Sequence, residues 1–86
     1  MPVHQVIIPK TVEKQIRKLA PQNQTDVKNA LRELSVNPYQ KNTVKLKSVS
    51  MGIFRIRVGD YRIRYDIDET SVIIRRVGHR RDVYNW

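Results

Sequence analysis

Residues 53–67 alternate apolar side chains with arginines on both sides of a Gly-Asp pair. This alternation around a two-residue turn signal is typical of a β-hairpin with one buried and one exposed face. If Gly59 and Asp60 form the turn, with Gly59 at positive φ, the register of the two strands follows by counting outward. The predicted cross-strand pairs are Val58 with Tyr61, Arg57 with Arg62, Ile56 with Ile63 and Arg55 with Arg64.

The two faces of this predicted hairpin differ in chemistry. The apolar face consists of Phe54, Ile56, Val58, Tyr61, Ile63 and Tyr65, and the opposite face consists of Arg55, Arg57, Arg62 and Arg64. Like charges directly opposite each other on a sheet destabilise it by about 0.2–1 kcal/mol per pair. Four arginines on one small face therefore indicate a negatively charged partner, and a polyanion is the natural candidate.

The charge of the chain also favours a nucleic-acid partner. Its 86 residues, expected to form a single domain over residues 1–86, contain 17 lysines and arginines against 8 acidic residues, a formal net charge of +9. All seven lysines precede residue 48, and eight of the ten arginines follow residue 54. Because a guanidinium binds phosphate oxygens in a bidentate way, the C-terminal half is predicted to make the more specific phosphate contacts.

The absence of cysteine excludes disulfides, thiolate zinc sites and a thiol nucleophile. No apolar run approaches the roughly 20 residues that a membrane span requires. The N-terminus also lacks the apolar core of a signal peptide. We therefore expect a soluble cytoplasmic protein that does not act at a membrane.

The rest of the chain predicts two helices and two more strands. A β-prone run at residues 4–8 ends at Pro9, and apolar residues at helical spacing follow over residues 9–20 and 21–36. Residues 39–51 are predicted to be a loop, and residues 72–77 form the last strand. The expected order is β-α-α-β-β-β, an α+β fold in which a two-helix hairpin packs on one face of a mostly antiparallel four-stranded sheet. The arginine face is then left open.

Charged residues around the last two strands carry further expectations. Arg64 is expected either to face the anionic partner or to pair with Asp66 or Asp68. The turn after the hairpin is predicted at residues 68–71, and the acids Asp66, Asp68 and Glu69 are attributed to a polar turn and not to a metal site. Because side chains alternate along a strand, Arg75 and Arg76 are predicted to lie on opposite faces of the sheet, so that at most one of them faces the site.

Three segments of the chain, taken in order, are similar to motifs of one protein family. They are Lys45-Leu46-Lys47, Gly59-Asp60-Tyr61-Arg62-Ile63-Arg64-Tyr65 and Val77-Gly78-His79-Arg80-Arg81-Asp82-Val83-Tyr84. With the order of elements, they resemble the RelE/ParE superfamily of bacterial and archaeal toxins over essentially the whole chain. The resemblance implies a cognate antitoxin protein, with which such a toxin can form a hetero-oligomer that binds operator DNA. On the RelE branch it implies ribosome-dependent cleavage of mRNA in the A site, and on the ParE branch inhibition of DNA gyrase.

The resemblance also implies, position by position, which residues surround the cleaved phosphate. The implied catalytic residues are Arg55, Arg57, Arg62, Arg80 and Tyr84, and the implied RNA-binding residues are Lys45, Lys47, Arg64, His79 and Arg81. No metal or cofactor is expected. Because every implied catalytic position carries suitable chemistry, the sequence favours an endoribonuclease. A gyrase inhibitor of the ParE type and a catalytically inactive basic binding protein are the alternatives.

Metal-free cleavage of RNA uses the neighbouring 2′-hydroxyl as nucleophile. The protein must then remove a proton, stabilise the phosphorane and protonate the leaving 5′ oxygen. Arginines suit the second task, but they do not give up a proton near neutral pH. We therefore expect Tyr84 to be the base, because nearby arginines lower the pKa of a tyrosine from its usual value of about 10. His79 is the alternative proton-transfer residue.

Overall fold

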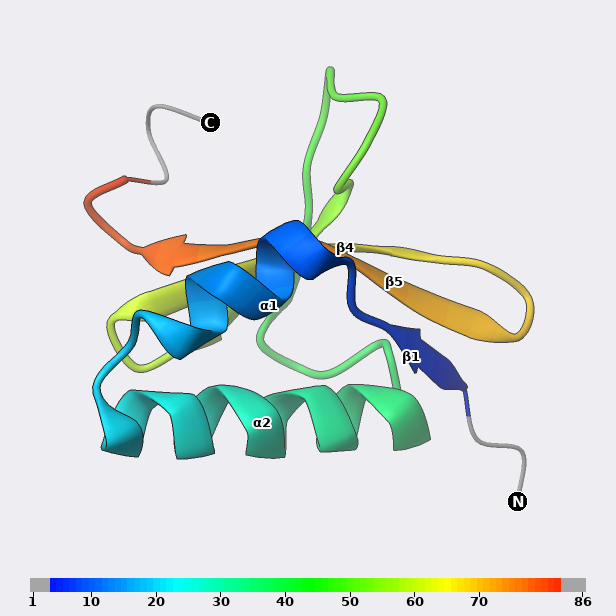
Figure 1. Ribbon diagram of the computed structural model, residues 1–86. Helices are drawn as coiled ribbons and strands as arrows, with labels where there is room; N and C mark the ends of the chain where they lie inside the picture. Colours follow the sequence, from blue (N-terminus) through cyan, green and yellow to red (C-terminus); the bar gives the residue numbers. More distant parts are fainter. Residues whose placement is uncertain (1–3, 83–86) are drawn as a thin grey trace.

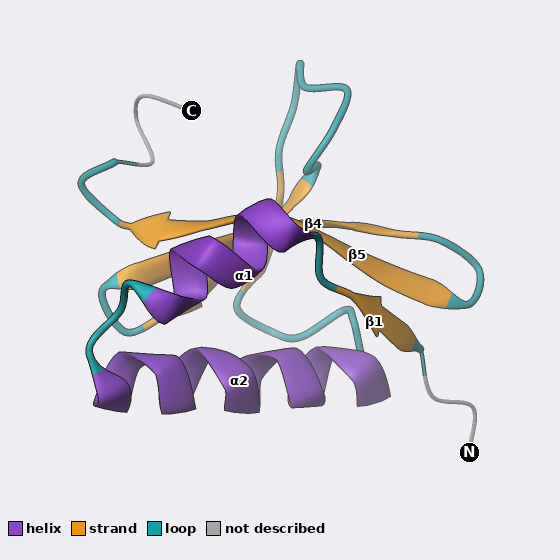
Figure 2. Ribbon diagram, in the orientation of Figure 1, coloured by secondary structure: helices purple, strands orange, loops and turns teal. Residues whose placement is uncertain are grey.

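The computed structural model describes residues 4–82, which form two helices and a five-stranded sheet (Figures 1 and 2). The elements are β1 (Gln5–Ile7), α1 (Lys10–Arg17), α2 (Pro21–Val36), β2 (Thr43–Lys45), β3 (Phe54–Val58), β4 (Tyr61–Ile67) and β5 (Ser71–His79). The strand order is β1-β5-β4-β3-β2. β1 runs parallel to β5, and all other neighbours are antiparallel. The predicted α+β fold is confirmed.

The predicted number of strands was wrong by one, because β2 lies within the segment that was predicted to be a loop. β2 pairs with β3, with Thr43 opposite Ile56 and Lys45 opposite Phe54. A strand of three residues is too short to show the alternation by which strands are recognised in a sequence. The sheet therefore gains a short edge strand next to the arginine hairpin.

Both helices lie on one face of the sheet (Figure 2). α1 buries Val12 and Ile16 against the sheet and ends at Arg17, earlier than the predicted helical segment. α2 begins with Pro21, which suits the first turn of a helix because the N–H that proline lacks would have no helical partner there. Neither of these helices, the ones found within residues 4–82, is long and apolar enough to cross a membrane.

The hydrophobic core lies between the helices and the sheet. It consists of Val12, Ile16, Val27, Ala30, Leu31 and Leu34 from the helices and Ile56, Ile63, Tyr65, Val72, Ile74 and Val77 from the sheet. Tyr65 is fully buried, and its Oη donates to the carbonyl oxygen of Pro38 at 2.8 Å and lies 2.9 Å from Oγ1 of Thr43. Burial raises the pKa of the Tyr65 phenol. This side chain ties the connection between α2 and β2 to the centre of the sheet.

The predicted register of the arginine hairpin is confirmed. All four predicted pairs are found, and Phe54 lies opposite Tyr65 in addition. Gly59 has the expected positive φ of 58° in the turn. Because Ile56 and Ile63 are buried under the helices, the alternating arginines must lie on the opposite face of the sheet, which no helix covers.

A β-bulge corrects the prediction for Arg75 and Arg76. Arg64 pairs with Arg76, but Tyr65 pairs with Ile74, so Arg75 is an extra residue in β5. Because of this extra residue, Ile74 and Val77 both point to the helix side and are buried, although they are three residues apart. Arg75 and Arg76 therefore lie on the same, open face. The prediction of opposite faces was wrong because a simple alternation has no place for an inserted residue.

Candidate nucleic-acid interface

The open face of the sheet, turned away from the helices, gathers arginines from three adjacent strands. They are Arg55 and Arg57 of β3, Arg62 and Arg64 of β4, and Arg75 and Arg76 of β5. Residues directly opposite each other on neighbouring strands have Cβ atoms only about 4.5–5.5 Å apart. Positive charge is thus concentrated on a small area, and fixed guanidinium groups in this arrangement attract phosphate.

Arg62 lies at the centre of this charge. Its Nη1 donates to two carbonyl oxygens at the hairpin turn, at 2.9 and 3.1 Å. Its pKa is lowered first by burial and then by the positive charges of Arg57, Arg55 and Arg80. The carboxylate of Asp60 acts in the opposite sense. A phosphate group bound here would relieve the repulsion among the guanidinium groups, so the electrostatics favour an anionic ligand.

Arg80 follows β5 and is held beside the hairpin turn. Its backbone N–H donates to the carbonyl oxygen of Asp60 at 2.7 Å, and its Nε lies 3.8 Å from Oδ1 of the same residue. Both side chains are well exposed, at 61% and 66%, so the ion pair itself adds little stability. The backbone hydrogen bond is what brings Arg80 within electrostatic reach of Arg62.

His79 lies on the other side of the sheet. It pairs with Tyr61 across the strands, and the two rings contact edge to face with centroids 5.4 Å apart. Its Nδ1 accepts a hydrogen bond from the backbone N–H of Arg81 at 3.2 Å, which closes the turn after β5. The structure therefore does not bring the imidazole to the arginines. Arg81 is exposed next to Arg80, and Tyr84 lies outside the described residues.

The two predicted lysines take different positions. Lys45 pairs with Phe54 and so shares the helix side of the sheet at its edge. Lys47 is exposed in the loop that joins β2 to β3. Of the two, only Lys47 lies in a segment that stands near the open face.

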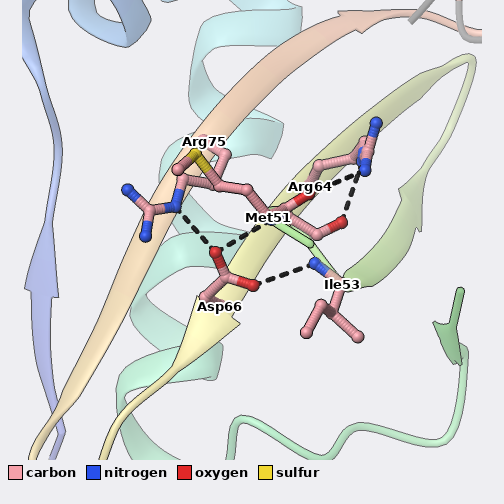
Figure 3. A network of polar contacts seen from close by, with 6 residues as sticks. Met51, Ile53, Arg64, Asp66 and Arg75 are labelled. Atoms are coloured by element: carbon pink, nitrogen blue, oxygen red, sulfur yellow. Dashed lines mark hydrogen bonds and ion pairs between the residues drawn. The ribbon is translucent and has the colours of Figure 1, made fainter. Parts of the chain in front are cut away.

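A carboxylate lies among the arginines of the open face (Figure 3). Asp66 accepts hydrogen bonds from the backbone N–H groups of Gly52 at 2.8 Å and Ile53 at 2.9 Å, and from Nε of Arg75 at 2.7 Å. Burial alone would raise the pKa of this carboxyl, but the three hydrogen bonds and the charge of Arg75 outweigh it and lower the pKa. Asp66 is therefore a charged anchor for the β2–β3 loop.

Arg64 belongs to the same network, and it binds carbonyl oxygens of the loop, not the carboxylates of Asp66 and Asp68 that were considered from the sequence. Its Nε donates to the carbonyl oxygen of Gly52 and its Nη2 to that of Met51, both at 2.9 Å (Figure 3). Two of its donors are thus engaged with the loop. Within residues 4–82, no group of three or more histidines, cysteines or acids is arranged to hold a metal ion.

Comparison with known proteins identifies the family. Residues 6–84 match the family model described as the ParE toxin of the type II toxin-antitoxin system parDE. This chain is a toxin of the RelE/ParE superfamily. RelE1 of Methanocaldococcus jannaschii is 31% identical to the toxin over 83 residues, with 92% of both chains covered. The toxin RelE3 of the same organism is 36% identical over 52 residues, or 60% of this chain and 58% of RelE3.

Solved structures share the fold of the toxin. In the toxin-antitoxin complex RelBE2 of Mycobacterium tuberculosis, the matching chain is 32% identical, with a TM-score of 0.80 over 92% of this toxin and 93% of that chain. The archaeal RelE-RelB complex from Pyrococcus horikoshii gives a TM-score of 0.78 over 91% of this toxin and 96% of that chain, at 22% identity. At this low identity, the similarity to the Pyrococcus horikoshii complex concerns the fold alone.

Sequence reasoning missed the anchor that the toxin builds from Asp66, Arg75 and Gly52. Asp66 was grouped with Asp68 and Glu69 as the acids of a polar turn, but it belongs to β4. A usable signal was present, because Asp66 follows Arg62 and Arg64 at the same two-residue spacing and must share their face. An acid at that position needed a partner, and only the structure identifies the partners as loop amides.

Replacing Gly52 by alanine should destabilise the toxin more than replacing Gly59. Both glycines have positive φ, at 63° and 58°, which costs an alanine about 1–2 kcal/mol. A Cβ at Gly52 would also lie 3.2 Å from Nε of Arg64, whereas one at Gly59 meets nothing within 4 Å. We expect Gly52→Ala to lower the free energy of unfolding by about 2–3 kcal/mol in urea titrations followed by circular dichroism. Equal losses for the two variants would show that the contact with Arg64 is unimportant.

Proposed function

We propose that this toxin is a ribosome-dependent mRNA endonuclease that cuts in the A site by attack of the 2′-hydroxyl on the neighbouring phosphate. The observation that carries the proposal is the cluster of Arg55, Arg57, Arg62 and Arg80 on the open face, where burial and then the neighbouring positive charges lower the pKa of Arg62. Donors fixed before the reaction stabilise charge as it develops, and this is the main task in metal-free phosphoryl chemistry. Such a target would place the action of the toxin in the cytoplasm.

Within this cluster the arginines divide by their hydrogen bonds. Arg64 and Arg75 use donors on the loop and on Asp66, so their part in phosphate binding is secondary. Arg57 and Arg62 lie opposite each other and next to the turn, and Arg80 is held there by Asp60. We assign these three to the phosphate, with Arg55 beside them.

Proton transfer requires a group other than these arginines. His79 lies on the helix side of the sheet and accepts a hydrogen bond at Nδ1. Asp66 is engaged by two amides and Arg75. These positions support the assignment of the base to Tyr84, which follows Arg80 by four residues in the chain. No metal or cofactor has a role in the proposed reaction.

The proposed protein partner is an antitoxin, as in the RelB complexes of the structural relatives. An acidic segment that folds upon binding would suit a surface with this density of arginine. A hetero-oligomer of toxin and antitoxin would then carry the operator-binding activity. The described part of the toxin itself contributes the cationic face to such a complex.

Inhibition of DNA gyrase is the second candidate, because the matching family model carries the ParE description. Primer extension on mRNA recovered from translating cells after toxin induction separates the two. Cuts at codon positions that disappear when translation initiation is blocked support the endonuclease. Intact mRNA together with DNA damage supports the gyrase inhibitor. If mRNA and DNA both stay intact while the protein still binds nucleic acid, an inactive basic binding protein is supported.

A further inference from the structure

The β2–β3 loop, residues 46–53, projects from the sheet on the side away from α2 (green in Figure 1). Its base is closed by a hydrogen bond of 2.7 Å from the N–H of Leu46 to the carbonyl oxygen of Ile53. The apolar side chains of Val49 and Met51 remain exposed, at 37% and 58%. Apolar burial therefore contributes little to holding this loop, and its polar contacts must do so.

These polar contacts come from the open face of β4 and β5 (Figure 3). Asp66 accepts from the amides of Gly52 and Ile53, and Arg64 donates to the carbonyl oxygens of Met51 and Gly52. Arg75 completes the network through Asp66. The loop backbone is thus bound through both its N–H donors and its carbonyl acceptors. The bound conformation also requires the positive φ of Gly52, which other residues rarely adopt.

A carboxylate on this face is costly for a protein that binds polyanions, because it repels phosphate. Its side chain is only 17% exposed, however, and its oxygens are occupied by the loop and by Arg75. The negative charge of Asp66 therefore serves to hold residues 52 and 53. A carboxylate at this position is useful to an RNA-binding protein if a fixed loop strengthens RNA binding more than the negative charge weakens it.

We propose that Asp66 is a positioning residue that holds the β2–β3 loop so that Lys47 contacts the RNA backbone beside the arginine face. The inference rests on the proposed function, since it takes ribosome-bound RNA as the partner. Lys47 lies five residues before Gly52 on the same exposed loop. A lysine on a fixed loop loses less conformational entropy on binding phosphate than one on a free loop.

The test compares Asp66→Asn with Asp68→Asn in purified toxin. Each variant removes one negative charge, so electrostatics alone predicts that both bind RNA more tightly. Asp68 is an exposed residue of the turn before β5, and its Oδ1 accepts the N–H of Glu69 at 2.8 Å. If Asp66 positions the loop, Asp66→Asn should instead weaken RNA binding, and Asp68→Asn should not. We expect its affinity for programmed ribosomes to fall about tenfold, while Asp68→Asn stays within about twofold of the natural toxin.

A double-mutant cycle with Lys47→Ala shows whether Asp66 acts through the loop. Lys47→Ala should weaken ribosome binding about five- to tenfold in the natural toxin and about twofold or less in Asp66→Asn. A general loss of stability would leave the effect of Lys47→Ala unchanged. Trypsin should also cut after Lys47 faster in Asp66→Asn than in Asp68→Asn, because the loop is released.

Two results would overturn the inference: equal affinities for Asp66→Asn and Asp68→Asn, or an undiminished effect of Lys47→Ala in Asp66→Asn. If Asp66→Asn does not fold, Gly52→Ala serves instead, because it disturbs the same anchor without a change of charge. Affinity is measured without cleavage, so a toxin that binds ribosomes but leaves mRNA intact refutes the endonuclease and not the positioning role. A toxin that binds no ribosomes refutes the positioning role as well.

Discussion

Replacing Arg62 by alanine should reduce mRNA cleavage by about 10²–10³-fold, the usual loss when one preorganised donor to a developing charge is removed. Arg62 lies opposite Arg57, and its pKa is lowered by burial and by three neighbouring guanidiniums. The negative charge of a phosphorane would therefore be stabilised most at this position. Arg57→Ala should have an effect of similar size. The measurement is single-turnover cleavage on programmed ribosomes, which separates the chemical step from binding.

Arg32→Ala is the matched control for this experiment. It removes the same charge from an exposed position of α2, on the side of the sheet away from the arginine face. Its cleavage rate should remain within about threefold of the natural rate, the scale of a single distant charge. If Arg32→Ala and Arg62→Ala lose activity to the same extent, net charge and not the arginine cluster governs cleavage.

Replacing Tyr84 by phenylalanine should lower cleavage by about 10²–10⁴-fold, the contribution typical of a positioned proton-transfer group. Affinity for the ribosome should be nearly unchanged, because only a hydroxyl is removed. Tyr84 is assigned this role because the other ionisable groups of the open face are not suited to take up the proton. Its arginines do not release protons near neutral pH, and Asp66 is engaged by amides and Arg75.

His79→Gln is the informative comparison for Tyr84→Phe. The imidazole contacts Tyr61 on the helix side and accepts the N–H of Arg81, so its loss should cost about tenfold or less through the turn that carries Arg80. The pH profile of the remaining activity should not change. A larger loss for His79→Gln than for Tyr84→Phe would transfer the role of the base to histidine.

The hairpin was the most predictable part of the toxin, for a physical reason. Side chains alternate with a period of two, and one glycine at positive φ fixes the turn, so every pair from Val58 and Tyr61 outward follows. The bulge at Arg75 was not predictable in the same way. An inserted residue is stabilised by pairing partners on β4 and by the side chain of Gln15, which accepts the N–H of Val77 at 2.8 Å, and these are distant in sequence.

The candidate site was predicted in part for the same reasons. Arg57 and Arg62 follow from the alternation, and Arg80 follows from the end of the last strand. The anchor of Asp66 on Gly52 depends on a loop conformation that no periodicity encodes. His79 was considered for the site because a histidine can transfer protons near neutral pH. Its pairing with Tyr61 places it on the helix side of the sheet, which the sequence alone did not show.

The pairing of the first strand with the last has a consequence for the synthesis of the toxin. β1 is hydrogen-bonded in the sheet to β5, with Gln5 opposite Ser71 and Ile7 opposite Ile73. Contacts between such distant parts of a chain form late and slow folding. While the ribosome is still translating the middle of the message, β1 has no strand to join. The sheet can therefore close only after β5 has been synthesised, so no part of the chain made before β5 can form the complete arginine face.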